Sequence, residues 1–143
     1  MADLTIRAAA RILIADDSSS MRRLLKKILE AHSNLWKVCA EAADGQEAIQ
    51  KTMESKPDLV IMDLQMPVLD GLGASKRIAK SLPAVPILIN TLYKSAYVDS
   101  EARNAGVRQV VSKDDSAGLL RAIETLLRAS QLPSRPPEQK PAT

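Results

Sequence analysis

The sequence of 143 residues has very little cysteine and very few aromatic residues. Its single cysteine, Cys39, cannot form a disulfide within the chain, which is typical of a protein from a reducing compartment. There is no Phe, one Trp and two Tyr, so a hydrophobic core must be built from Leu, Ile, Val, Ala and Met. These counts argue against a disulfide-stabilised secreted domain.

Long apolar segments and a strong charge of one sign are also missing. No apolar run approaches the roughly 20 residues that span a bilayer, and the N-terminus lacks the pattern of a secretory signal peptide. The net charge of +3 is too mild, and the basic residues are too scattered, to argue for a nucleic-acid-binding protein. We therefore expect a cytoplasmic protein that neither crosses a membrane nor carries a DNA-binding domain.

Short apolar segments alternate five times with helical patterns along the chain. The segments read as buried strands at 11–15, 36–43, 59–62, 87–91 and 108–112, and the helical patterns follow each of them. This alternation predicts an α/β fold with a doubly wound, five-stranded parallel sheet and right-handed crossovers. Strands two and five look like edges, so a strand order of 2-1-3-4-5 fits.

The chain divides into three parts. Residues 1–10 are a short lead-in of mixed character, and residues 11–130 hold all the strand and helix patterns. Residues 131–143 are rich in Pro and polar residues, so we expect a disordered tail without a core. A single domain with 45% hydrophobic and 26% charged residues is the expected organisation.

Polar side chains follow four of the predicted strands. Asp16 and Asp17 follow the first, Asp63 the third, Thr91 ends the fourth, and Lys113 follows the fifth. Because the carboxyl ends of parallel strands meet at one edge of a sheet, we expect these side chains to converge there, where ligands bind in open α/β sheets.

Such a cluster suits phosphoryl chemistry with a divalent cation. Three nearby carboxylates repel one another, and Mg²⁺ relieves the repulsion because it prefers oxygen ligands. Lys113 and Thr91 can bind phosphoryl oxygens, and a carboxylate can act as the nucleophile that forms an aspartyl phosphate. Asp63 is central in the predicted sheet, so it is the natural phosphoacceptor.

Five sequence motifs in order resemble the receiver domain of bacterial response regulators. They are ILIADD at the first strand, ADGQEA after the second, DLVIMDLQMPVLDG around the third, ILINT at the fourth and VSK at the fifth. The resemblance covers roughly residues 11–130 and implies the CheY-like (flavodoxin-like) fold. It also implies a role in two-component signalling, as a phosphoprotein of a phosphorelay.

The resemblance assigns roles to the site residues. Asp63 would accept a phosphoryl group from a sensor histidine kinase or a His-containing phosphotransfer protein. Asp17, Asp63 and the main-chain carbonyl of Gln65 would bind Mg²⁺ directly, and Asp16 would act mainly through a metal-bound water. Thr91 would bind the phosphoryl oxygens.

The resemblance also implies a route for output. Lys113 would join Thr91 on the phosphoryl oxygens, and phosphorylation would shift the face formed by the fourth helix, fifth strand and fifth helix. We expect a stand-alone receiver, without an output domain, that catalyses only its own phosphorylation and dephosphorylation. Its partner would be a downstream protein target, and a homodimer could form through the same face.

Three positions depart from the family pattern. Val110 stands where an aromatic residue is usual, Leu92 where a small residue is usual, and Asp114 where proline is usual. The valine cannot couple to Thr91 as an aromatic would, Leu92 would crowd the phosphoryl pocket, and Asp114 adds negative charge. We also expect Leu92 and Tyr93 to shield the aspartyl phosphate from water.

Two other functions stay open at this point. A degenerate receiver would act as a phosphorylation-independent interaction module; the three departures favour it, whereas the intact Asp17, Asp63, Thr91 and Lys113 oppose it. A small phosphohydrolase with an aspartate nucleophile would need a second aspartate two residues later, where this chain has Gln65.

Overall fold

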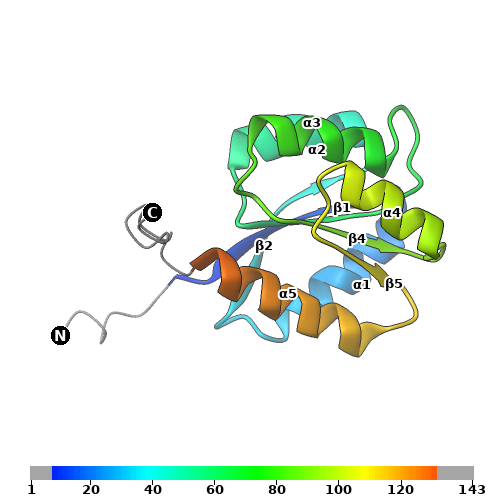
Figure 1. Ribbon diagram of the computed structural model, residues 1–143. Coiled ribbons are helices and arrows are strands. Elements are labelled where there is room, and N and C mark those ends of the chain that lie inside the picture. Colours follow the sequence, from blue (N-terminus) through cyan, green and yellow to red (C-terminus); the bar gives the residue numbers. More distant parts are fainter. Residues whose placement is uncertain (1–7, 132–143) are drawn as a thin grey trace, which may run out of the picture.

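The structure, a computed structural model, describes residues 8–131. One parallel sheet has the order β2-β1-β3-β4-β5, as predicted (Figure 1). Its strands are β1 (Ala10–Ala15), β2 (Trp36–Ala42), β3 (Leu59–Met62), β4 (Ile87–Thr91) and β5 (Gln109–Ser112). The helices are α1 (Ser19–Glu30), α2 (Gly45–Ser55), α3 (Gly71–Ser81), α4 (Ala96–Asn104) and α5 (Ser116–Gln131). The predicted α/β class is confirmed.

Helices cover both faces of the sheet. Helices α1 and α5 lie on one face, and α2, α3 and α4 lie on the other (Figure 1). Alternate strand residues supply the two cores: Ile12 and Ile14 pack toward α1 and α5, whereas Leu13 and Ala15 pack toward the other helices. Burial on both faces explains why the strands are continuous apolar runs.

Element boundaries differ from the predicted ones by one or two residues. Ala10 already pairs with Trp36, so β1 begins inside the predicted lead-in of residues 1–10. Helix α4 begins at Ala96, because the Ser95 hydroxyl accepts the Val98 N–H at 3.1 Å and caps it. Helix α5 continues to Gln131, and the remainder of the predicted tail lies outside the described residues.

The loop after β3 folds back against the strand that it leaves. Asp70 caps α3 by accepting the Gly73 N–H at 2.8 Å, and the Gly71 N–H donates to the Leu64 carbonyl at 2.8 Å. A side chain at Gly71 would overlap the carbonyl oxygen of Asp63. The Asp-Gly pair is therefore what lets α3 begin so close to Asp63.

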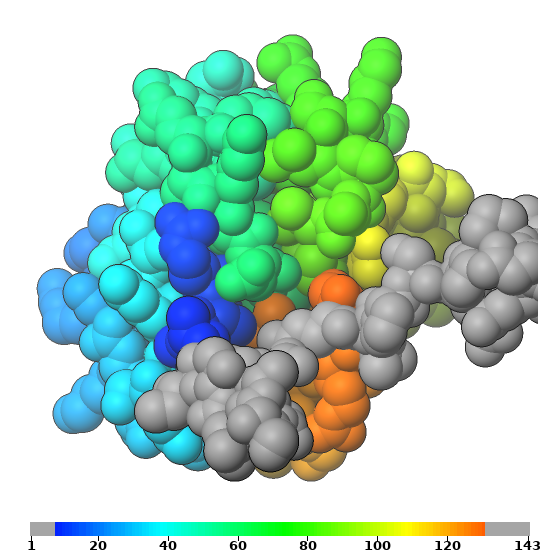
Figure 2. Space-filling view, turned by 90° about the vertical axis from the view of Figure 1, so that its left-hand side faces the viewer, coloured from blue at the N-terminus to red at the C-terminus, as the bar shows by residue number. Residues whose placement is uncertain are grey.

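The two ends of the sheet differ in character. Figure 2 shows the side on which the strands begin, where the start of β1 (dark blue) lies between the cyan segment near β2 and the green segment near β3. The polar residues of interest lie at the opposite, carboxyl end.

Within residues 8–131, no helix is both long enough and apolar enough to cross a membrane.

Candidate functional site

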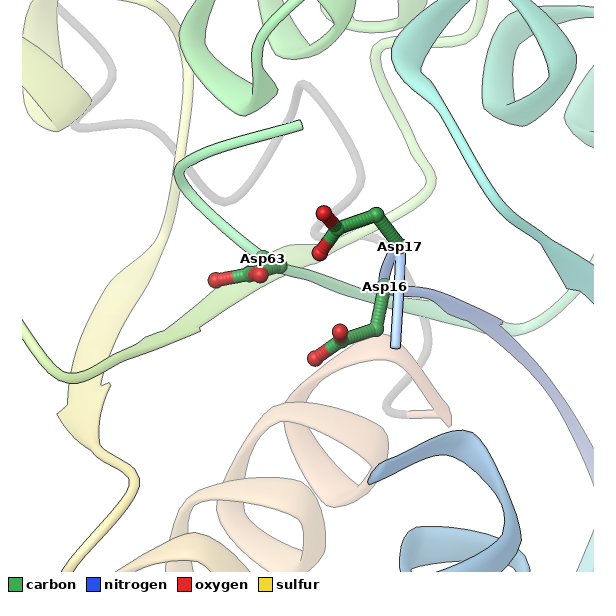
Figure 3. Close-up of side chains that lie close together, drawn as sticks. All are labelled: Asp16, Asp17 and Asp63. Atoms are coloured by element: carbon green, nitrogen blue, oxygen red, sulfur yellow. The ribbon is translucent and has the colours of Figure 1, made fainter. Parts of the chain in front are cut away.

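Three aspartates meet at the carboxyl end of the sheet. Asp16 and Asp17 directly follow β1, and Asp63 directly follows the neighbouring strand β3 (Figure 3). One carboxylate oxygen from each residue lies within 4.8 Å of the other two. Asp16 and Asp63 are buried, whereas Asp17 is exposed to solvent. The cluster therefore has two fixed carboxylates and one that faces water.

Lys113 brings a positive charge to this cluster. Its Nζ lies 2.8 Å from Asp16 Oδ2 and 3.3 Å from Asp63 Oδ2. The lysine follows β5, so its side chain crosses the end of β4 to reach β3 and β1. One ammonium group thus holds two carboxylates that come from different strands.

Backbone groups orient the two buried carboxylates. Asp16 Oδ1 accepts the Ser18 N–H at 2.9 Å, and Asp63 Oδ1 accepts the Leu64 N–H at 2.8 Å. In both residues the other oxygen, Oδ2, is the one that contacts Lys113. Each carboxylate is therefore held by main chain on one side and presents its second oxygen to the site.

The electrostatics of the cluster favour an added cation. Burial, and then the negative charge of Asp16, raise the pKa of Asp63 above its usual value, although Lys113 partly offsets them. Burial opposes the charged form of Lys113, but the hydrogen bond to Asp16 and the charge of Asp63 prevail and raise the lysine pKa. One cation facing three carboxylates leaves the cluster with excess negative charge.

The donor set fits Mg²⁺. All three groups offer carboxylate oxygens, which are the ligands that this hard cation prefers, and it commonly retains several waters beside one or two carboxylates. Nitrogen and sulfur donors, which would favour zinc or copper, do not take part in this three-residue group. The acidic cluster is typical of a magnesium site.

An open cavity of about 220 Å³ lies beside these groups. Its walls are formed by Asp17, Asp63, Gln65, Leu92, Tyr93 and Lys113. Leu92 and Tyr93 are 60% and 55% exposed, so they form its rim. Thr91 is fully buried at the same sheet edge, where its hydroxyl oxygen accepts the Tyr93 N–H at 3.1 Å.

Comparison of the sequence with known protein families identifies the family that has this arrangement. The family model described as the response regulator receiver domain matches residues 12–124. The chain belongs to this family. Receiver domains act in two-component signalling. The acidic cluster and its lysine come from three of the five sequence motifs, ILIADD, DLVIMDLQMPVLDG and VSK.

The relatives that this chain matches are longer proteins, and the match covers only part of each. The transcriptional regulatory protein LnrK of Bacillus subtilis is 38% identical over 117 residues, which is 81% of this chain and 53% of that protein. A protein-glutamate methylesterase/protein-glutamine glutaminase of Geobacter sulfurreducens is 37% identical over 122 residues, 82% of this chain and 33% of that protein. The chain therefore spans about half, or less, of the length of these relatives.

Solved receiver structures superpose closely. A two-component response regulator of the LuxR family from Aurantimonas sp. SI85-9A1 has a TM-score of 0.80 at 35% identity, covering 85% of this chain and 86% of the other. The response regulator domain of Thermotoga maritima CheB has a TM-score of 0.78 at 30% identity, covering 84% and 97%.

The three departures from the receiver pattern lie in different environments. Val110 is half-buried and packs against the core under α2, α3 and α4. Asp114 is exposed, and its N–H donates to the Ser112 hydroxyl at 3.2 Å. Leu92, which was expected to crowd the phosphoryl pocket or the slot beside it, lines the cavity, and its largely exposed side chain lies at the rim. All three leave the carboxylates and Lys113 in contact.

One supporting residue of the receiver site gave no signal in the sequence. Arg22 of α1 donates from Nη1 to the Asp16 carbonyl at 2.6 Å, and its Nε lies 3.0 Å from Glu41 Oε1. On an amphipathic helix an arginine at this position reads as part of the solvated face. In the fold it ties the backbone of Asp16 to α1 and β2.

Proposed function

We propose that this receiver accepts a phosphoryl group on Asp63 from a phosphohistidine of a sensor histidine kinase or a His-containing phosphotransfer protein. An Asp63 oxygen attacks the phosphorus, the new P–O bond forms as the P–N bond breaks, and the leaving imidazole nitrogen keeps the electron pair and takes up a proton. The observation that carries the proposal is Asp63 on the wall of an open cavity, 3.3 Å from Lys113.

The other residues of the site have supporting roles. Mg²⁺, when bound, neutralises negative charge on the transferring phosphoryl group. Asp17, Asp63 and the main-chain carbonyl of Gln65 would hold the cation, with Asp16 contributing through a water. Lys113 would then move from the carboxylates to a phosphoryl oxygen, and the Thr91 hydroxyl would donate to another.

The proposed chemistry is limited to the protein itself: the chain catalyses its own phosphorylation and dephosphorylation. The exposed side chains of Leu92 and Tyr93 at the cavity rim would shield the aspartyl phosphate from attacking water. Leu92→Ala should therefore release phosphate faster than the wild type. An unchanged release rate would remove this role from Leu92.

We propose that the signal leaves through the face of α4, β5 and α5. An open groove of about 800 Å³ is lined by residues of these three elements and of the loops beside them, among them Arg103, Arg108 and Arg121. The occupant would be a downstream protein target, or a second copy of the chain in a homodimer. A cytoplasmic location, as the single Cys39 favours, would place the receiver beside the kinase.

The decisive experiment is incubation with acetyl phosphate and Mg²⁺, followed by intact mass measurement. The wild type should gain the mass of one phosphoryl group, and Asp63→Asn should not. Asp58→Asn is the matched control, because Asp58 lies just before β3 at the opposite end of the sheet. It should be phosphorylated normally.

Two outcomes would contradict the proposal. No adduct on the wild type, from acetyl phosphate or from a phosphorylated histidine protein, would mean a degenerate receiver that works as an interaction module. Rapid turnover of small phosphate monoesters without a lasting adduct would mean a phosphohydrolase.

A further inference from the structure

Asn90 is a buried polar residue on the central strand β4. Only 2% of its surface is exposed. Leu88 packs toward α1 and α5, whereas Ile87 and Ile89 pack toward the other helices. Because strand side chains alternate between faces, the Asn90 side chain lies on the α1 and α5 face.

The strand register places Asn90 in one row with the catalytic carboxylates. Ala15 pairs with Met62, Met62 with Ile89, and Ile89 with Val110. The next row across the sheet therefore consists of Asp16, Asp63, Asn90 and Val111. Ile14 and Ile61 belong to the core under α1 and α5, so Asp16 and Asp63 project from that same face.

Lys113 has to cross strand β4, which carries Asn90, to reach its partners. Strand β5 has β4 as its neighbour, and the carboxylates that Lys113 contacts follow β3 and β1, beyond β4. Val111 belongs to the core under α1 and α5, so Lys113, two residues later, starts on the face of Asn90. The lysine side chain therefore crosses the end of β4 on the face from which Asn90 projects.

The amide oxygen of Asn90 is unused in this resting arrangement. Oδ1 is fully buried and has no hydrogen-bond partner among residues 8–131. Leaving such a group unsatisfied is unfavourable. The Lys113 ammonium has three N–H donors, and two of them are accounted for by Asp16 and Asp63.

We propose that Asn90 is a positioning residue for Lys113, whose third N–H donates to Asn90 Oδ1 when Asp63 carries the phosphoryl group. The inference rests on the proposed function. When Lys113 moves from the two carboxylates to a phosphoryl oxygen, as proposed above, it gives up its carboxylate acceptors, so an N–H group is left without one. The amide oxygen then supplies a neutral acceptor that holds the ammonium over the pocket.

The test compares Asn90→Val with Asn90→Thr, which have nearly the same shape and differ by one hydroxyl acceptor. Both are β-branched and suit a strand. With acetyl phosphate and Mg²⁺, Asn90→Val should be phosphorylated about tenfold more slowly than the wild type, the effect of losing one hydrogen bond to a charged group. Asn90→Thr should recover most of the rate.

A second measurement uses the metal-free, unphosphorylated protein. If Oδ1 is unpaired at rest, Asn90→Val should unfold in urea at a midpoint equal to or higher than that of the wild type. Thr52→Val is the matched control, since Thr52 Oγ1 is also buried and unpaired among the described residues but lies on α2, on the other face. It should show the same stability change with no change in phosphorylation rate.

The outcomes separate this inference from the function on which it rests. A wild type that takes no phosphoryl group overturns the proposed function and this inference with it. A normal wild type with an unaffected Asn90→Val, or with both Asn90 variants equally slow, overturns the inference alone. So does a lower unfolding midpoint for Asn90→Val, because the amide would then be bonded already at rest.

Discussion

Neutralising Asp63 should stabilise the resting protein although it removes the proposed phosphorylation site. At an effective dielectric constant of about 20, Asp63 and Lys113 at 3.3 Å attract by about 5 kcal/mol. Asp16, within 4.8 Å, repels Asp63 by about 3.5 kcal/mol, and solvent-exposed Asp17 adds about 1 kcal/mol in water. Attraction and repulsion nearly cancel, so the cost of burying the carboxylate decides whether neutralising Asp63 stabilises or destabilises the protein.

We therefore expect Asp63→Asn to raise the free energy of unfolding by about 1–2 kcal/mol at neutral pH without Mg²⁺, because the amide removes a buried charge. Urea unfolding followed by circular dichroism measures this difference. Glu124→Gln is the matched control: that residue is 58% exposed and 3.8 Å from Arg128, so its loss should change stability by less than about 0.5 kcal/mol.

The pH dependence checks the same reasoning. Folding raises the pKa of Asp63 above its ordinary value of 3.8. The stability that this group contributes is therefore fully present at pH values below 3.8, and it is lost as the pH rises through the raised pKa of the folded state. The advantage of Asp63→Asn should thus be absent in acid and appear toward neutral pH. A variant less stable than the wild type at neutral pH in the absence of Mg²⁺ would refute the argument.

Three further predictions concern the site and the loop that carries it. Lys113→Met should lower the free energy of unfolding by about 3 kcal/mol, because it leaves buried carboxylates unpaired, and should abolish the mass adduct. Gly71→Ala should cost at least about 2 kcal/mol in urea unfolding, since the new side chain overlaps the Asp63 carbonyl oxygen. Val68 is a β-branched residue at φ 70°, in the centre of a tight turn that is closed by a 2.7 Å hydrogen bond between its neighbours. Val68→Asn should therefore raise the thermal midpoint by an amount that corresponds to about 1 kcal/mol of unfolding free energy. An unchanged midpoint would show that this turn is unstrained.

The sequence was sufficient to predict the architecture and the carboxylate cluster. Continuous apolar runs that end on polar residues are typical of buried parallel strands, and parallel strands bring their carboxyl ends to one edge of the sheet. Asp16, Asp17 and Asp63 could therefore be brought together without knowledge of any distance. Gly71 could be recognised as part of a turn, although its close approach to the Asp63 carbonyl could not.

Other details of the site depend on tertiary contacts that leave no local pattern. Arg22 has the spacing of a solvated helix residue, yet it binds the Asp16 carbonyl because β1 ends beside α1. The Thr91 hydroxyl already accepts a backbone N–H, which a strand-end threonine does not reveal. From the sequence, Asn90 could be interpreted only as a strand residue. The tertiary structure is needed to show that its amide oxygen is unpaired among the described residues and that it lies in the row of Asp16 and Asp63.

The excess negative charge links the stability of the receiver to its proposed activity. Repulsion among the two buried carboxylates and the exposed one is expected to destabilise the resting protein. A divalent cation bound only by the folded state would stabilise it, by about 2.7 kcal/mol at 100 times its dissociation constant. The same excess would keep Lys113 among the carboxylates until the proposed phosphorylation offers it new oxygens. Without this repulsion, as in Asp63→Asn, the resting protein would be more stable, and its affinity for Mg²⁺ and for a phosphoryl group would be lower. The strain at the carboxyl end of the sheet is thus the physical basis expected for a switch that responds to Mg²⁺ and phosphate together.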